Sequence, residues 1–134
     1  MELIPANERQ TQKSDRSWFT GEVWLETINL APAPARHRAV HVTFEAGART
    51  AWHSHPLGQT IYVVEGVGVI GTRDALPRVI RAGDSVWLPP GEEHWHGAAP
   101  DEKMKHISIQ EAESGFVTTW MEHVAEEDYS TLAE

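Results

Sequence analysis

The 134-residue sequence contains no cysteine. Disulfides, thiolate metal ligands and cysteine nucleophiles are therefore excluded, and a reduced intracellular setting fits this composition. Basic residues are also scarce, because 11 Lys and Arg stand against 20 Asp and Glu and give a formal net charge of −9. Such an acidic surface repels phosphate groups, so we expect neither nucleic acid nor an anionic membrane as a partner.

Long apolar segments are missing as well. No run approaches the roughly 20 residues that a membrane-spanning helix requires. The first residues, Met1 to Pro5, show neither the basic nor the apolar region of a signal peptide. We expect a cytoplasmic protein with one domain over residues 1–134, a length that buries a core without disulfides.

The sequence shows no long amphipathic helix. It contains instead short segments, rich in β-branched residues, whose side chains alternate between two faces and which are separated by glycine and proline turns. In residues 38–45, for example, Val40, Val42 and Phe44 share one face of a strand and His41 and Thr43 share the other. Further strands are expected at residues 22–30, 50–55, 59–64, 69–70, 79–80, 85–88, 104–111 and 117–123. This pattern predicts an all-β sandwich or barrel.

The remaining segments are expected to flank or connect these strands. Residues 1–20 are polar and predict an irregular N-terminal arm, attached to the barrel or to a neighbouring subunit by Trp18 and Phe19. Gly66 and Gly68 predict a tight turn. Residues 125–132 predict a short acidic helix.

Histidine is abundant, and four of the eight histidines form two close pairs. His53 and His55 would lie about 6–7 Å apart on the same face of a strand. That spacing suits two imidazoles that converge on one metal ion, with His94 as the third nitrogen donor. The alternative is a set of buried histidines that hydrogen-bond to one another or to the backbone.

The spacing around both pairs resembles the two sequence motifs of the cupin family. The first, residues 47–66, contains Gly47, His53, His55, Gln59 and Gly66, and the second, residues 83–98, contains Gly83, Pro89, Gly91 and His94. Gln59 stands where that family usually has glutamate, and Ala98 where it usually has asparagine. The resemblance implies a single small jelly-roll (double-stranded β-helix) barrel with His53, His55, Gln59 and His94 as metal ligands.

A narrower likeness connects residues 48–53, 55–60, 91–100 and 120–124 to the small bacterial manganese-dependent hydroxynitrile lyases. It implies a site of three histidines and one glutamine around Mn²⁺, with Fe²⁺, Zn²⁺, Ni²⁺ or Co²⁺ as alternatives. It also implies the reversible cleavage of (R)-cyanohydrins such as mandelonitrile into aldehyde and hydrogen cyanide. We further expect a homodimer or homotetramer.

Gln59 is the residue that separates this site from an ordinary cupin site. Three imidazoles and an amide keep the charge of a divalent metal at +2, whereas glutamate would lower it to +1. A more positive site favours anionic guests and Lewis-acid chemistry. In the alternative interpretation Gln59 is a hydrogen-bond donor beside a three-histidine site.

Two other functions compete with the lyase. One is a three-histidine iron or manganese dioxygenase, and the other is a non-enzymatic metal- or ligand-binding cupin.

Two further histidines are candidates for proton transfer. His106 shares a strand face with Ser108 and Gln110, and a neutral imidazole there would accept the cyanohydrin proton; the alternative is a polar lining residue without a chemical role. His96 lies two residues beyond His94 and faces the same interior, either toward substrate or in a supporting hydrogen bond.

The other side chains are expected to shape the pocket or to pack. Val40 and Val42 would border the substrate, and Thr50 and Gln110 would donate hydrogen bonds to it. Trp52 is expected inside the barrel, Trp87 and Trp95 in packing or rim positions, and His37, His41 and His123 at the outer surface.

Overall fold

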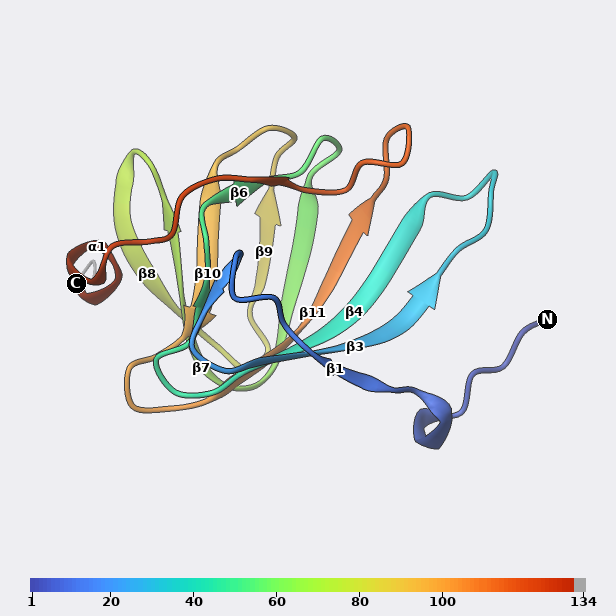
Figure 1. Cartoon of the computed structure of the whole chain (residues 1–134), viewed down its shortest axis with the longest axis horizontal. Helices are drawn as coiled ribbons and strands as arrows, with labels where there is room; N and C mark the ends of the chain where they lie inside the picture. The colour runs from blue at the N-terminus through green and yellow to red at the C-terminus, as the bar shows by residue number, and fades with distance from the viewer. Residues whose placement is uncertain (132–134) are drawn as a thin grey trace.

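The computed structural model describes residues 1–131, and its regular secondary structure is almost entirely β-strand (Figure 1), which confirms the all-β prediction. A 12-stranded sheet curls into a half-barrel. The strands are β1 Thr11–Lys13, β2 Phe19–Thr20, β3 Val23–Leu30, β4 His37–Phe44, β5 Arg49–Thr50, β6 His53–Ser54, β7 Gln59–Thr72, β8 Ala75–Arg81, β9 Ser85–Leu88, β10 His94–Ala98, β11 Met104–Glu111 and β12 Thr119–Trp120. The helical elements are the 3₁₀ turn η1 Ala6–Glu8 and the helix α1 Glu126–Ser130.

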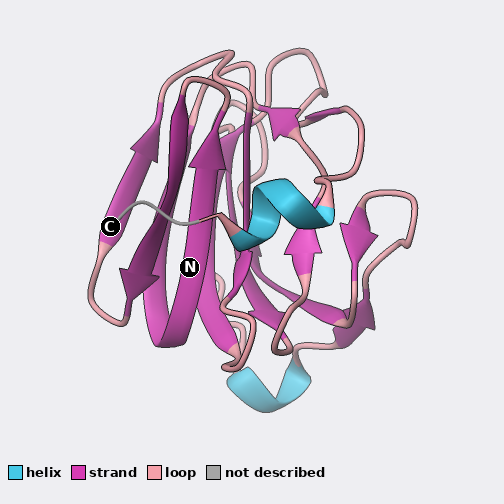
Figure 2. Cartoon of the chain, turned by 90° about the vertical axis from the view of Figure 1, so that its left-hand side faces the viewer, coloured by secondary structure: helices cyan, strands magenta, loops and turns pink. Residues whose placement is uncertain are grey.

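Figure 2 shows the two layers of the half-barrel, and the pairing of the long strand β7 places it in both of them. Its first half pairs with β11 and β9, and β11 continues through β4 and β3 to β1. Its second half pairs with β8 and β10, and β10 in turn pairs with β5 and β6. The metal-site candidates lie on β6, β7 and β10, except for His55, which directly follows β6, so this shared strand determines how the two sequence motifs meet.

The tight turn predicted at Gly66 and Gly68 is wrong, because β7 runs through both positions without interruption. Gly66 has φ +80°, and a Cβ there would collide with the carbonyl oxygen of Lys103. Glycine is therefore needed for the close approach of the β10–β11 connection and for the bend that carries β7 from one layer to the other.

Two apolar clusters hold the layers together. The main core lies inside the half-barrel and includes Phe44, Ile61 and Met104, all fully buried. A second cluster joins Trp52 and Trp95 to the C-terminal segment. The packing role predicted for Trp95 is thus consistent with the structure, whereas Trp52 packs in this second cluster instead of filling the barrel.

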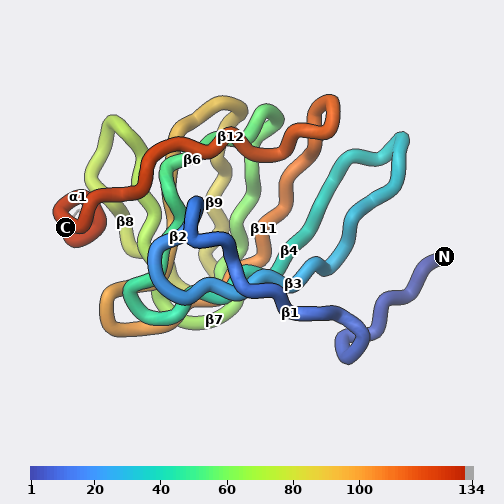
Figure 3. Tube along the Cα trace, viewed as in Figure 1, coloured from blue at the N-terminus to red at the C-terminus, as the bar shows by residue number. Residues whose placement is uncertain are grey.

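The ends of the chain contribute more structure than their composition indicates. The arm is not wholly irregular, because β1 extends the sheet beside β3 and β2 pairs with β5. The segment after β11 crosses the molecule to α1 (Figure 3), and only β12 of the strand predicted at residues 117–123 forms, paired with β6. The helix ends at Ser130, and the predicted end at Leu132 lies outside the described residues.

Several strand boundaries differ from expectation. The predicted strand at residues 50–55 is divided into β5 and β6, and residues 69–70 are part of β7. Strand β8 is longer than residues 79–80, and β10, which carries the second histidine pair, was not predicted. Within residues 1–131, no helix combines the length and the apolar character needed to cross a membrane.

Candidate metal centre and pocket

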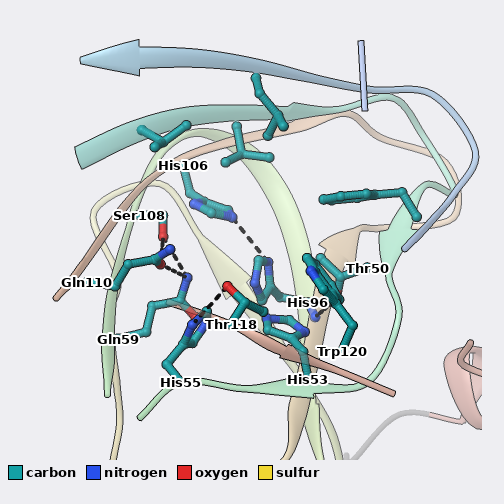
Figure 4. A pocket seen from close by; sticks show the side chains of 14 residues that line it. Thr50, His53, His55, Gln59, His96, His106, Ser108, Gln110, Thr118 and Trp120 are labelled. Carbon is teal, nitrogen blue, oxygen red and sulfur yellow. Dashed lines mark hydrogen bonds between the residues drawn. The ribbon is translucent and has the colours of Figure 1, made fainter. Parts of the chain in front are cut away.

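A cavity of ≈ 200 Å³ opens inside the half-barrel. One part of its wall is apolar and comes from β2, β3, β4 and the C-terminal segment; the other part is polar and comes from β5–β7, β10 and β11 (Figure 4). Its lining is Phe19, Leu25, Val40, Val42, Thr50, His53, His55, Gln59, His96, His106, Ser108, Gln110, Thr118 and Trp120.

The structure brings the predicted pocket and proton-transfer residues to this cavity, together with three of the four predicted metal ligands. The fourth, His94, is not part of the lining but contacts Gln59 from β10. The three outer histidines lie away from the cavity: His37 and His123 are exposed, and His41 contacts Glu26 on the outer side of the sheet. Trp87 is 58% exposed at the rim of β9.

The three predicted histidine ligands share one hydrogen-bond arrangement. In each, Nδ1 contacts a backbone carbonyl, so a neutral ring carries its proton there and keeps a free lone pair on Nε2. This is the usual second partner of a metal-binding histidine, because it fixes both the tautomer and the ring orientation. The contacts are His53 to Ala51 O (2.9 Å), His55 to Val117 O (2.7 Å) and His94 to Glu92 O (2.9 Å).

Gln59 and His94 face each other through two acceptor atoms. The Oε1 of Gln59 lies 3.0 Å from His94 Nε2, while the amide nitrogen of Gln59 donates to β11. A neutral His94 has one proton, and its Nδ1 contact with Glu92 uses it. The lone pairs of Gln59 Oε1 and His94 Nε2 therefore point at one another and repel. A cation between the two atoms would remove this repulsion. Two ligands at right angles on a divalent ion, each about 2.1 Å from it, are about 3.0 Å apart. These donors thus fit a metal.

Burial keeps these imidazoles neutral at pH 7. Burial lowers the pKa of His94 to about 4, against an opposing contact with the Glu92 carbonyl. Burial, followed by the neighbouring rings of His94 and His55, lowers the pKa of His53 well below its ordinary value. Burial also lowers the pKa of His55. Metal ligation requires deprotonated histidine, so these shifts favour the binding form.

The buried rings of His96 and His106 lie in contact with each other, and we call these two residues the His96–His106 pair. Nε2 of His106 lies 3.1 Å from Nδ1 of His96 (Figure 4). Phe44 packs against both rings. The other two nitrogens, His96 Nε2 and His106 Nδ1, are buried without a partner among the described residues. Burial lowers the pKa of His106 to about 4 and that of His96 well below its ordinary value. The pair is therefore neutral and has unused hydrogen-bonding capacity beside the cavity.

One ring nitrogen each of His53, His94 and His96 lies within 4.8 Å of the other two. Measured between ring centroids, however, His55 is 5.0 Å from His53 and 5.4 Å from His94, whereas His96 is 5.3 Å and 5.8 Å from the same two rings. The sequence did not indicate how near His96 lies to the other rings. We still favour His55 over His96 as a ligand, because Nδ1 of His96 faces His106 instead of a backbone carbonyl.

The sequence interpretation also missed part of the apolar wall. Phe19, Leu25 and Trp120 line the cavity, and the Trp120 ring lies 4.8 Å from His53 on one side and stacks on Trp18 at 5.5 Å. The aromatic residues at 18–19 signalled an attachment to the barrel, but only the fold shows that this attachment contributes to the cavity.

The Cupin domain family matches residues 40–110 of the chain. Among curated proteins, an (R)-mandelonitrile lyase from Granulicella tundricola is 46% identical, over 96% of this chain and 98% of that protein. Among solved structures, a cupin-like protein from Thermotoga maritima superimposes with a TM-score of 0.83 at 40% identity, covering 87% of this chain and 89% of that chain.

A more distant structure shares the fold alone. The polyketide cyclase RemF from Streptomyces resistomycificus gives a TM-score of 0.74 at 16% identity, covering 96% of this chain and 90% of that chain.

Proposed function

This chain belongs to the cupin family, and from that premise we propose that it is a metal-dependent hydroxynitrile lyase. The reaction is the reversible cleavage of an (R)-cyanohydrin such as mandelonitrile into an aldehyde and hydrogen cyanide. The observation that carries the proposal is that donors fit for a divalent cation, two neutral histidine nitrogens without a partner and an apolar wall all lie in or directly beside one cavity. The substrate class is supported by the relative named (R)-mandelonitrile lyase.

The residues proposed to hold the metal are His53, His55, His94 and Gln59. All four are neutral donors, so a divalent ion keeps its charge of +2, and Mn²⁺ is the ion we propose. When bound, it would supply Lewis acidity to a reaction in which negative charge develops on oxygen and cyanide. The hydrogen bonds from Nδ1 to backbone carbonyls hold the three rings in the orientation that this role needs.

The His96–His106 pair would accept the proton of the substrate hydroxyl. If Nδ1–H of His96 donates to Nε2 of His106, the free lone pair of His96 lies on Nε2, the atom without a partner. Protonation at that Nε2 allows the Nδ1 proton to pass to His106, so both rings share the positive charge. The substrate O–H bond breaks, its electrons form the carbonyl, the carbon–cyanide bond breaks, and cyanide leaves with the bonding pair. Cyanide then takes the proton back from the pair.

The cavity wall would orient the rest of the substrate. Val40, Val42 and Leu25 present aliphatic surface to the same cavity, which suits an aryl or alkyl group of a cyanohydrin. Thr50 accepts a hydrogen bond from the His96 backbone and so positions β10 beside the cavity. Gln110, at the polar end, would offer its amide nitrogen to the substrate.

Cyanide release from racemic mandelonitrile tests the proposal. We expect release with Mn²⁺-loaded protein, none above the buffer rate after chelation, and recovery on refilling. A His94→Ala variant should lose both metal and activity, whereas the matched His123→Ala variant, altered at an exposed histidine, should keep both. Equal release with loaded and chelated protein would refute the proposed role of the metal. Uptake of dioxygen by the same protein would instead support the dioxygenase alternative.

A further inference from the structure

The carboxamide of Gln59 is held by two side chains of the neighbouring strand β11. Its Nε2 donates to Ser108 Oγ at 2.6 Å and to Gln110 Oε1 at 3.1 Å. Ser108 Oγ in turn donates to the same Gln110 oxygen at 2.8 Å. The three side chains thus form a closed triangle that uses both amide protons of Gln59 and the hydroxyl proton of Ser108 (Figure 4).

The ladder between β7 and β11 creates this triangle. Gln110 is directly opposite Gln59, and Ser108 is opposite Ile61, two residues along and therefore on the same face. Gln59 and Ser108 are 3% and 5% exposed, so water does not compete freely for these hydrogen bonds. The geometry follows from strand register and is not a property of a mobile loop.

The triangle determines where the Gln59 oxygen points. With the amide nitrogen committed to β11, Oε1 faces the opposite direction, toward His94 Nε2 at 3.0 Å. Reversing Gln59 alone would place its oxygen beside Gln110 Oε1, and the single hydroxyl proton of Ser108 could then serve only one of these two oxygens.

We propose that Ser108 is a positioning residue that holds the Gln59 oxygen toward the metal and makes position 59 selective for an amide. This inference rests on the proposed metal site. A carboxylate at position 59 has no N–H to donate, so its second oxygen would lie beside Gln110 Oε1 and compete with it for the one hydroxyl proton of Ser108. Ser108 thereby helps to retain a neutral ligand and the +2 charge that the lyase reaction would use.

A double-mutant cycle on Mn²⁺ affinity tests the role of Ser108. The free Mn²⁺ signal in electron paramagnetic resonance is titrated with chelated, refilled wild type, Ser108→Ala, Gln59→Ala and the double variant. We expect Ser108→Ala to weaken binding by about 10-fold, the low end for a residue that supports a metal ligand. In the Gln59→Ala background the same change should have no further effect, and Ser108→Thr should restore affinity. Ser85→Ala, at an exposed serine on β9, is the matched control and should bind like wild type.

Each outcome either supports or overturns the positioning role of Ser108. An equal loss in both backgrounds, or no loss in either, overturns the positioning role while leaving the metal site intact. A wild type that binds no Mn²⁺ removes the proposed site and this inference together. Circular dichroism of each variant identifies any loss that comes from unfolding.

Discussion

Acidification should destabilise the metal-free protein through its buried histidines. The pKa of His94 and that of His106 are both lowered to about 4 by burial, from an ordinary 6.5 in the unfolded chain. Between these values the unfolded chain binds more protons, so the free energy of unfolding falls as the pH falls from about 6.5 toward 4. Above pH 7 both states are neutral and the effect disappears.

The size of the effect follows from the two pKa values. Between pH 7.5 and pH 5, each of these histidines should lower the free energy of unfolding by about 2 kcal/mol, or about 4 kcal/mol together. His53, His55 and His96 shift in the same direction and add to this loss. For a domain of this size, 4 kcal/mol corresponds to a decrease in Tm of about 15 °C.

Urea unfolding of the chelated protein at a series of pH values measures this loss. A His106→Gln variant keeps a polar side chain beside His96 but does not titrate, so its stability should fall by about 2 kcal/mol less over the same range. A free energy of unfolding that stays constant from pH 7.5 to pH 5 would refute the assignment of these rings as buried and neutral. A His106→Gln variant with the wild-type slope would refute it for His106 alone.

Three further substitutions test other parts of the structure. Gln59→Glu should slow cyanide release at least about tenfold, because it lowers the site charge to +1; unchanged release would contradict the role of charge. Phe44→Ala should reduce the free energy of unfolding by about 3–5 kcal/mol in urea, since the ring is fully buried; a loss below about 1 kcal/mol would contradict its place in the core. Arg73→Ala should lower stability by about 0.5–1 kcal/mol, because its guanidinium lies 3.8 Å from the Trp52 ring centroid, and Arg73→Lys should recover part of that loss in the same measurement.

The sequence predicts the parts of the fold that depend on local alternation. Strands β3, β4, β9 and β11 lie where the patterns placed them, to within a residue or two, because each has one apolar face. Strand β10 was missed because its short sequence, His94–Ala98, is buried on both faces and does not alternate. Gly66 indicated a turn because glycine marks both turns and strand bends, and only the approach of Lys103 distinguishes them.

In the candidate site, too, the sequence predicts some features, and others depend on contacts between residues far apart in the chain. Motif spacing predicts which histidines approach one another, because β6 and β10 pair directly at His53 and His94. It does not predict that Trp120, more than sixty residues from His53, covers that ring, since this depends on where the C-terminal segment crosses the barrel. Nor does it predict the Ser108 triangle, which depends on the register between β7 and β11.

Chiral chromatography of racemic mandelonitrile during turnover tests the proposed function most directly. With Mn²⁺-loaded protein, we predict that the (R)-enantiomer disappears while benzaldehyde and cyanide form in equal amounts and the (S)-enantiomer remains. Loss of both enantiomers at the buffer rate, with or without the metal, would contradict the proposal.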